Sequence, residues 1–201
     1  MGLHARLYDA ICGWEEKRGL LEWRRQLVSD VEGEVLEIAA GTGLNLRHYS
    51  KRARVFASEF DPVMLARAVE RARQSIARVC LLVADAMRLP VPDESVDVVV
   101  IGLALCSIPD PAAALTEARR VLRPHGKLRF IEHVRADEGT FEGRAQDAFN
   151  PVWRVISGGC NCNRRSEQTV RSTGFDIVEI HRFRMGLPLL APHVMAEAVP
   201  A

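Results

Sequence analysis

EVLEIAAGTG, at residues 34–43, is the stretch of the sequence that decides the fold. Its mostly apolar first half predicts a short buried strand over residues 34–39. Small residues follow, and Gly41 and Gly43 let the backbone turn tightly and approach a ligand before a short helix to about Tyr49. A glycine-rich turn that binds nothing would show the same pattern, so the ends of the other strands must decide between the two alternatives.

Along the rest of the chain, short apolar runs alternate with segments of helical periodicity. Asp61-Pro62 and Asp110-Pro111 each predict a helix start, because Asp caps a helix and Pro fits its first position. Strands that alternate with helices imply a parallel sheet with right-handed crossovers. Four further strands are predicted at residues 54–59, 79–84, 96–102 and 127–134, the last of them after a helix stop at Pro124-His125-Gly126.

The two ends of the chain complete a single domain over residues 1–201. Helical spacing over residues 3–28, broken at Gly13 and Gly19, predicts an N-terminal helical lid within residues 1–30. Two extended segments close the chain with no helix between them, which predicts a hairpin and hence one antiparallel strand. These segments are 175–184 and about 191–199, and they follow helices predicted at 141–157, interrupted at Pro151, and at 163–172.

The composition is that of a folded protein with no strong charge. Apolar residues make up 48% and charged residues 26% of the chain, which excludes a disordered protein. The net charge of +1 gives no general attraction for nucleic acid or anionic lipid, and no signal for an oligomeric state is found. The longest apolar run, at 98–106, is far shorter than the roughly 20 residues of a membrane-spanning helix. Because a signal-peptide core is also lacking, we expect a cytoplasmic protein without stable membrane insertion.

In that compartment the five cysteines are expected to be free thiols. Cys160-Asn-Cys162 places two metal-binding side chains close together in the sequence. No second Cys or His pair follows at zinc-finger spacing, so the sequence predicts no metal site.

The predicted strand ends carry residues that suit a nucleoside. Ligands of open α/β sheets bind at the carboxyl ends of the strands. Glu59 ends the second strand, 22 residues after Glu37, where an acid accepts hydrogen bonds from ribose hydroxyls. Asp85 and Ala86 follow the third strand and offer a carboxylate and a backbone N–H to adenine. The fourth strand ends in an apolar stretch, and this order of features favours a bound adenosine.

A dinucleotide-dependent oxidoreductase is the natural alternative. Its G-x-G-x-x-G pattern fails in both frames, because the third glycine is replaced by Leu44 or by Leu46. A chain of 201 residues also leaves no room for a substrate domain beside a dinucleotide domain. The sequence therefore argues against this class.

Four segments resemble class I S-adenosylmethionine-dependent methyltransferases, especially those around the ubiquinone and menaquinone methyltransferases. They are VLEIAAGTG, SEFDPVMLARA, DAMRLPVPDESVDVVV and ARRVLRPHGKL, within about residues 31–135. The resemblance implies a Rossmann-like α/β fold with a seven-stranded, mostly parallel sheet and an antiparallel last strand. It also implies that S-adenosyl-L-methionine is the cofactor. The cofactor-binding residues it implies are Ala39, where many members have Gly, with Gly41, Gly43, Glu59, Met64, Asp85, Ala86 and Leu103.

A narrower resemblance covers the rest of the chain. LALCSIPDP, FIEHV, Trp153, GGCNCNR and APHV are similar to the small thiol S-methyltransferases of the methyltransferase-like seven group and their bacterial relatives. The resemblance implies a small-molecule acceptor and favours a thiol. The animal members carry an N-terminal membrane anchor, and no such segment is expected here. N- or C-methylation of an amine, a phospholipid headgroup or a quinone-type acceptor stays open, as does a module that binds the cofactor without catalysis.

Two histidines are the candidate catalytic residues. His133 ends the fifth strand and His193 begins the last, although either could be a structural histidine bonded to backbone. A thiol is partly ionised at neutral pH, so it needs a base less than an alcohol or a carbon nucleophile does. Arg164 is a candidate for holding an anionic substrate group, with a surface salt bridge as the alternative. Tyr8 is a candidate substrate contact. Tyr8 and Trp14 are also candidates for an N-terminal helical lid that excludes water, with ordinary core packing as the alternative.

Overall fold

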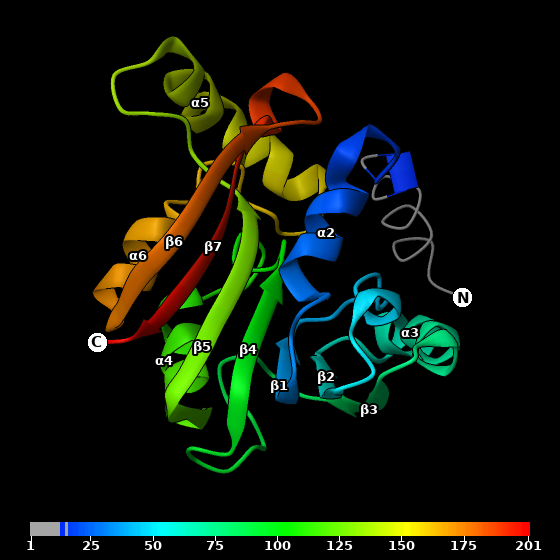
Figure 1. The fold of residues 1–201 in the computed structure, drawn as a ribbon. Helices are drawn as coiled ribbons and strands as arrows, with labels where there is room; N and C mark the ends of the chain where they lie inside the picture. The colour runs from blue at the N-terminus through cyan, green and yellow to red at the C-terminus, as the bar shows by residue number, and fades with distance from the viewer. Residues whose placement is uncertain (1–12, 15) are drawn as a thin grey trace.

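A seven-stranded sheet in the order β3-β2-β1-β4-β5-β7-β6 forms the centre of the molecule (Figure 1). The structure, a computed structural model, describes residues 13–14 and 16–201. The five strands β3, β2, β1, β4 and β5 pair with one another in parallel, whereas β7 is antiparallel to both of its neighbours, β5 and β6. The predicted fold with one antiparallel strand is confirmed. The strands are β1 (Gly33–Ile38), β2 (Ala53–Glu59), β3 (Arg78–Val83), β4 (Val96–Gly102), β5 (Leu122–His133), β6 (Phe175–Arg184) and β7 (Pro192–Pro200).

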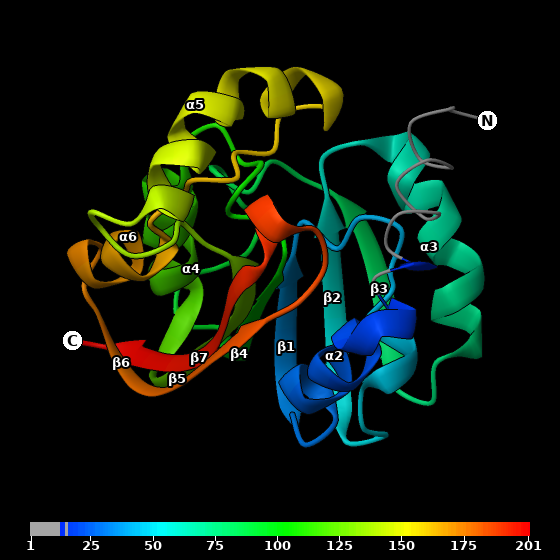
Figure 2. The ribbon, with the colours of Figure 1, turned by 90° about the horizontal axis from the view of Figure 1, so that it is seen from above.

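Helices cover both faces of this sheet (Figure 2). On one face Val99 and Ile101 of β4 share a buried cluster with α4 and α6, and on the other Val100 belongs to a cluster with α2 and α3. A strand buried on both faces needs a continuous apolar run, which is why β4 lacks alternation. The helical elements are η1 (Glu16–Leu20), α2 (Leu21–Val28), η2 (Leu46–His48), α3 (Pro62–Gln74), α4 (Pro111–Val121), α5 (Phe141–Ile156), α6 (Ser166–Ser172) and η3 (Pro188–Leu190).

The two predicted helix starts are confirmed by their caps. Asp61 accepts a hydrogen bond of 2.8 Å from the Val63 N–H at the start of α3. Asp110 accepts bonds of 3.0 Å from the Ala112 and Ala113 N–H groups at the start of α4. Each cap satisfies backbone donors that have no partner inside the helix.

Three predicted boundaries are wrong. α5 continues through Pro151, because hydrogen bonds to other segments hold the helix on both sides of the proline. Before the proline, the buried Gln146 side-chain amide donates to three backbone carbonyls. After it, Trp153 Nε1 donates to Cys160 Sγ. β5 begins at Leu122, so Pro124-His125-Gly126 lies within the strand and does not separate the strand from α4. The register of β5 against β4 shifts at this segment. The last helix begins at Ser166 and is shorter than predicted.

The N-terminal lid is described only from residue 13 onward, so Tyr8 lies outside the described residues. Gly19, with φ of 122°, is a non-helical residue within η1, so the helical segment is interrupted at this glycine as predicted. α2 packs on the sheet, where Trp23 stacks on Phe183 of β6 at 3.9 Å between ring centroids. Within residues 13–14 and 16–201, no helix combines the length and the apolar character needed to cross a membrane.

Candidate active site

The turn after β1 has an unusual backbone. Ala39, Gly41 and Gly43 have φ values of 53°, 60° and 80°, in the left-handed region that favours glycine. A Cβ at Gly43 would lie 2.7 Å from Leu46 Cδ1 and 2.9 Å from Ala68 Cβ, so this glycine lets the turn pack against α3. The turn thus brings a closely packed backbone, strained at Ala39, to the carboxyl end of β1.

Glu59 connects this turn to the start of α3. Its carboxylate oxygens accept hydrogen bonds from the N–H groups of Gly41, at 2.8 Å, and Asp61, at 2.9 Å. A carboxylate has about four lone-pair positions, so each oxygen retains one for a further donor. The acidic side chain that the sequence assigns to a ribose is therefore held in place by the backbone on both sides.

The other predicted cofactor residues lie at the same edge of the sheet. Asp85 follows β3 and accepts a 2.9 Å bond from the Met87 N–H, while Ala86 and Met64 are largely buried. Leu103 follows β4 with φ of 57° and donates its N–H to Ile131 O at 2.7 Å. Parallel pairing brings these strand ends together, and two carboxylates with backbone donors fit the polar groups of an adenosine. We call this set the cofactor edge: Ala39, Gly41, Gly43, Glu59, Met64, Asp85, Ala86 and Leu103.

A buried polar network of Arg24, Asn45 and Glu37 lies beside the turn that follows β1. The sequence did not predict this network. Glu37 of β1 is 1% exposed and accepts a 2.8 Å bond from Asn45 Nδ2. Arg24 of α2 donates to Asn45 Oδ1 at 2.9 Å. Burial raises the pKa of Glu37 to about 7, although the Asn45 hydrogen bond opposes the shift. A glutamate inside an apolar strand was the one sign of this network in the sequence. Its partners Asn45 and Arg24 lie outside β1, so the sequence did not connect them with it.

The loop after β4 is fixed by Glu132, which sequence reasoning also missed. This fully buried carboxylate accepts the N–H groups of Ala104 at 2.7 Å, Leu105 at 2.8 Å and Cys106 at 3.4 Å. Burial raises the pKa of Glu132 to about 7. Since Glu132 belongs to β5, it ties the loop beyond Leu103 to the neighbouring strand.

The two candidate histidines lie opposite each other at the ends of β5 and β7. His133 and His193 are register partners, and their rings are 6.1 Å apart and nearly perpendicular. His193 Nδ1 lies 3.0 Å from Ala191 O, which accepts its proton and leaves Nε2 as an acceptor. Burial lowers the pKa of His193 to about 4, so the ring is neutral at neutral pH. The structure thus brings together the two histidines that the sequence proposed.

His133 also contacts a cysteine that the sequence did not connect with it. Its Nε2 lies 3.0 Å from Cys160 Sγ, and Trp153 Nε1 donates to the same sulfur at 3.4 Å. Hydrogen bonds from Cys106 and His133 lower the pKa of Cys160 to about 4, and the pairing raises that of Cys106. Cys80, Cys106, Cys160 and Cys162 are free thiols, as predicted, and Cys12 lies outside the described residues. We call Cys106, His133 and Cys160 the Cys–His–Cys cluster.

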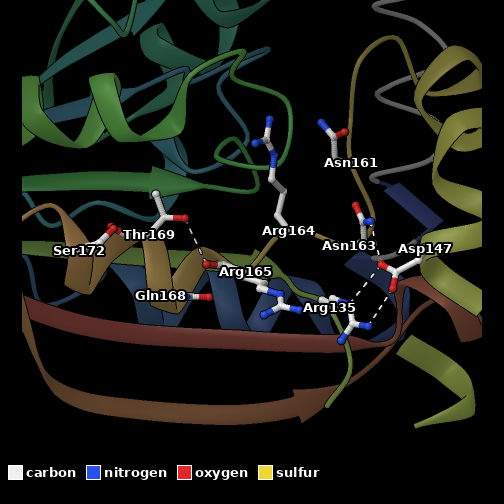
Figure 3. A pocket seen from close by; sticks show the side chains of 9 residues that line it. All are labelled: Arg135, Asp147, Asn161, Asn163, Arg164, Arg165, Gln168, Thr169 and Ser172. Carbon is white, nitrogen blue, oxygen red and sulfur yellow. Dashed lines mark hydrogen bonds and ion pairs between the residues drawn. The ribbon is translucent and has the colours of Figure 1, made fainter. Parts of the chain in front are cut away.

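Arg164 lines a separate polar pocket of about 530 Å³ (Figure 3). Its guanidinium points away from the Arg135–Asp147 ion pair and donates to Ile108 O at 3.1 Å. Arg164 forms no ion pair with the residues that the structure describes. Asn161 also lines the pocket and donates its side-chain N–H to Cys106 O, so the pocket adjoins the Cys–His–Cys cluster.

Known proteins resemble this chain in sequence and in structure. The family described as a methyltransferase domain matches residues 36–130. Human thiol S-methyltransferase TMT1B is 32% identical over 190 residues, which cover 88% of this chain and 78% of the human protein. Demethylmenaquinone methyltransferase of Thermus thermophilus is 36% identical over 128 residues, covering 60% and 58% of the two chains.

Two solved structures show the fold alone. A SAM-dependent methyltransferase from Aquifex aeolicus has a TM-score of 0.63 at 16% identity, covering 92% of this chain and 90% of that chain. The [4+2]-cyclase SpnF has a TM-score of 0.71 at 19% identity, covering 90% and 80%. Because a cyclase shares the fold, the fold by itself does not determine the reaction.

The fold, the cofactor edge and these relatives define a class I methyltransferase that uses S-adenosylmethionine. The chain belongs to the family of the thiol S-methyltransferases TMT1A and TMT1B. The predicted class of enzyme and the predicted cofactor are thereby confirmed.

Proposed function

We propose that this protein transfers a methyl group to the sulfur of a small-molecule thiol. The juxtaposition of the cofactor edge with the facing pair His133 and His193 carries the proposal, because β4 and β5 are neighbours in the sheet. The relatives that match most of the chain are thiol S-methyltransferases. The phosphatidylethanolamine N-methyltransferase of Cereibacter sphaeroides matches 53% of the chain, which favours a thiol over an amine.

The cofactor edge is proposed to hold the cofactor, with Glu59 on the ribose and Asp85 with the Ala86 N–H on the adenine. S-adenosylmethionine supplies the activated methyl group and the leaving group. The turn at Ala39, Gly41 and Gly43 provides the surface for the methionine part, and Met64 and Leu103 provide apolar contact. The protein then has mainly to position the acceptor sulfur and exclude water.

His193 is proposed as the group that accepts a hydrogen bond from the acceptor thiol and so directs its sulfur. Its Nε2 is left as an acceptor by the bond from Nδ1 to Ala191 O, and Phe183 stacks on its ring at 5.3 Å between centroids. His133, on the facing strand, is proposed to orient the acceptor together with Cys160. Arg164 and Tyr8 are proposed as contacts to the rest of the acceptor, Arg164 for an anionic group.

A panel of acceptors tests the proposal. The purified protein is incubated with methyl-labelled S-adenosylmethionine and an alkyl thiol, an aryl thiol, a primary amine or a phenol. We expect a labelled methyl thioether, identified by mass spectrometry, from at least one thiol. Glu59→Ala should abolish most of the turnover, whereas Glu70→Gln, an exposed change on α3, should not. Methylation of the amine or phenol with no thioether formed would overturn the thiol assignment.

A further inference from the structure

The Cys–His–Cys cluster has the composition and spacing of a metal site. One ligand atom from each of Cys106, His133 and Cys160 lies within 4.8 Å of the other two. The residues come from the loop after β4, the end of β5 and the segment after α5. Cys106 and His133 are buried, and Cys160 is partly buried. Two sulfurs and one imidazole nitrogen are ligands that zinc accepts readily.

The distances fit a tetrahedral ion after a small movement. With Zn–S of about 2.3 Å and Zn–N of about 2.0 Å, two sulfurs bound to one ion lie about 3.8 Å apart, and sulfur and nitrogen about 3.5 Å. The 3.0 Å between His133 Nε2 and Cys160 Sγ is therefore somewhat shorter than the bound distance. Side-chain adjustment of about 1 Å would open the cluster around an ion.

The backbone of the cluster is held by bonds that a metal would not disturb. Glu132 fixes the Cys106 N–H, and Asn161 donates both its backbone and side-chain N–H groups to Cys106 O at 2.9 Å. On the other side Ser157 Oγ donates to Cys160 O at 3.3 Å. Cys106 and Cys160, far apart in the sequence, are thus linked through Asn161 into one rigid unit, which is the preorganisation that a metal site requires.

We propose that Cys106, His133 and Cys160 bind one Zn²⁺ ion, and that its open fourth position takes the sulfur of the acceptor. The second half rests on the proposed function. A Cys₂His set with an open position is a known catalytic zinc arrangement. Two thiolates neutralise the ion, so a third thiolate gives a negative centre that attracts the positive sulfonium.

The transfer balances without an oxidant. The acceptor thiol loses its proton to water as its sulfur binds the ion. The bond between this sulfur and the methyl carbon then forms, while the bond from that carbon to the sulfonium breaks. Its electron pair stays on the departing sulfur, and the uncharged thioether leaves the ion. Zinc has no redox chemistry, so it acts only by holding the acceptor as a thiolate.

Metal binding is tested with the metal alone, without cofactor or acceptor. Reduced, metal-free protein is titrated with Zn²⁺ and with Co²⁺ as a spectroscopic probe. We expect one ion per chain and a sulfur-to-cobalt charge-transfer band. Cys106→Ser, Cys160→Ser and His133→Ala should each weaken Zn²⁺ binding at least about 100-fold, since each removes one of three ligands.

Two cysteine variants are matched controls. Cys162 is buried two positions from Cys160, but its sulfur lies against Gln146 O and Asn150 Oδ1, and Cys80 is exposed on β3. Cys162→Ser and Cys80→Ser should bind Zn²⁺ as tightly as the unmodified protein. No stoichiometric uptake by the folded, reduced protein, or unchanged uptake by Cys160→Ser, would overturn the site. A Cys106–Cys160 disulfide in the freshly purified protein, with no uptake after reduction, would do the same.

The open position has its own test. Adding ethanethiol to the Co²⁺-loaded protein should change the charge-transfer band, whereas ethanol should leave it unchanged. An unchanged band with ethanethiol would overturn the role of the ion in holding the acceptor. Thioether formation by protein stripped of metal would also overturn that role, but it would leave thiol methylation standing as the function.

Discussion

The cofactor edge and the Cys–His–Cys cluster are neighbours in the molecule, yet they are built in different ways. The cofactor edge consists of strand ends and the residues directly after them, so each contact depends on a short segment. The cluster draws on the loop after β4, the end of β5 and the segment after α5. A local site follows once the strands form, whereas an assembled site also needs the connections between distant segments.

Glu132 is the residue on which the assembled part depends most. It binds three successive N–H groups of the loop that carries Cys106. Glu59 has the comparable position at the cofactor edge, but it binds two N–H groups near the surface. The difference in burial predicts that a change at Glu132 affects stability and that a change at Glu59 affects mainly ligand binding.

The largest expected effect is that of Glu132→Ala on stability. It leaves three buried N–H groups without an acceptor, at about 1–3 kcal/mol each, so the free energy of unfolding should fall by about 3 kcal/mol or more. The melting temperature should drop by roughly 10 °C in thermal unfolding followed by circular dichroism. Glu132→Gln keeps an oxygen for two of the three donors and should lose less. Equal melting temperatures for Glu132→Ala and the unmodified protein would show that the loop does not need this anchor.

Glu59→Ala should act on the cofactor instead. Hydrogen bonds to a charged group are worth roughly 1.5–3 kcal/mol each, so losing those to the ribose should weaken S-adenosylhomocysteine binding at least about tenfold. Isothermal titration calorimetry measures the affinity, with Glu70→Gln as the control on the exposed side of α3. Unchanged affinity would remove Glu59 from the cofactor edge.

The contrast also explains what the sequence could predict. Alternating strands and helices indicated the sheet, and the glycine-rich turn, Glu59 and Asp85 each stood beside a recognisable strand end. No local pattern connects Cys160 with His133, and the absence of zinc-finger spacing argued against a metal. Ligands from three elements have no fixed spacing, because the fold brings them together. For the same reason α5 was predicted to break at Pro151, although contacts from other segments hold it.

The substitution His193→Asn tests the roles of the two ring nitrogens separately. The Asn Nδ2 can replace Nδ1 as donor to Ala191 O, but nothing replaces Nε2 as acceptor. We expect kcat with a thiol to fall by about tenfold, a modest loss because a thiol is partly ionised without help. S-adenosylhomocysteine affinity should stay within about twofold. His181→Asn, an exposed change on β6, is the control, and a loss of cofactor affinity equal to the loss of kcat would contradict a role on the acceptor.

The smallest effect concerns Glu37, beneath the cofactor edge. Burial raises the pKa of this carboxyl to about 7 in the folded protein, against 4.5 for an unperturbed glutamate. A raised folded-state pKa means that the folded protein holds the proton more tightly than the unfolded chain does. Its stabilising effect is complete below pH 4.5 and is lost as the pH rises through about 7.

Glu37→Gln removes this dependence while keeping an oxygen for the Asn45 Nδ2–H. Between pH 6 and pH 8 the unmodified protein should therefore lose about 1 kcal/mol of unfolding free energy relative to the variant. Urea unfolding of both proteins at several pH values measures the difference. A constant difference from pH 6 to pH 8 would mean that Glu37 is already ionised at pH 6. The Arg24–Asn45 network would then stabilise the charged carboxylate more than burial opposes it, and the cofactor edge would rest on a buried charge.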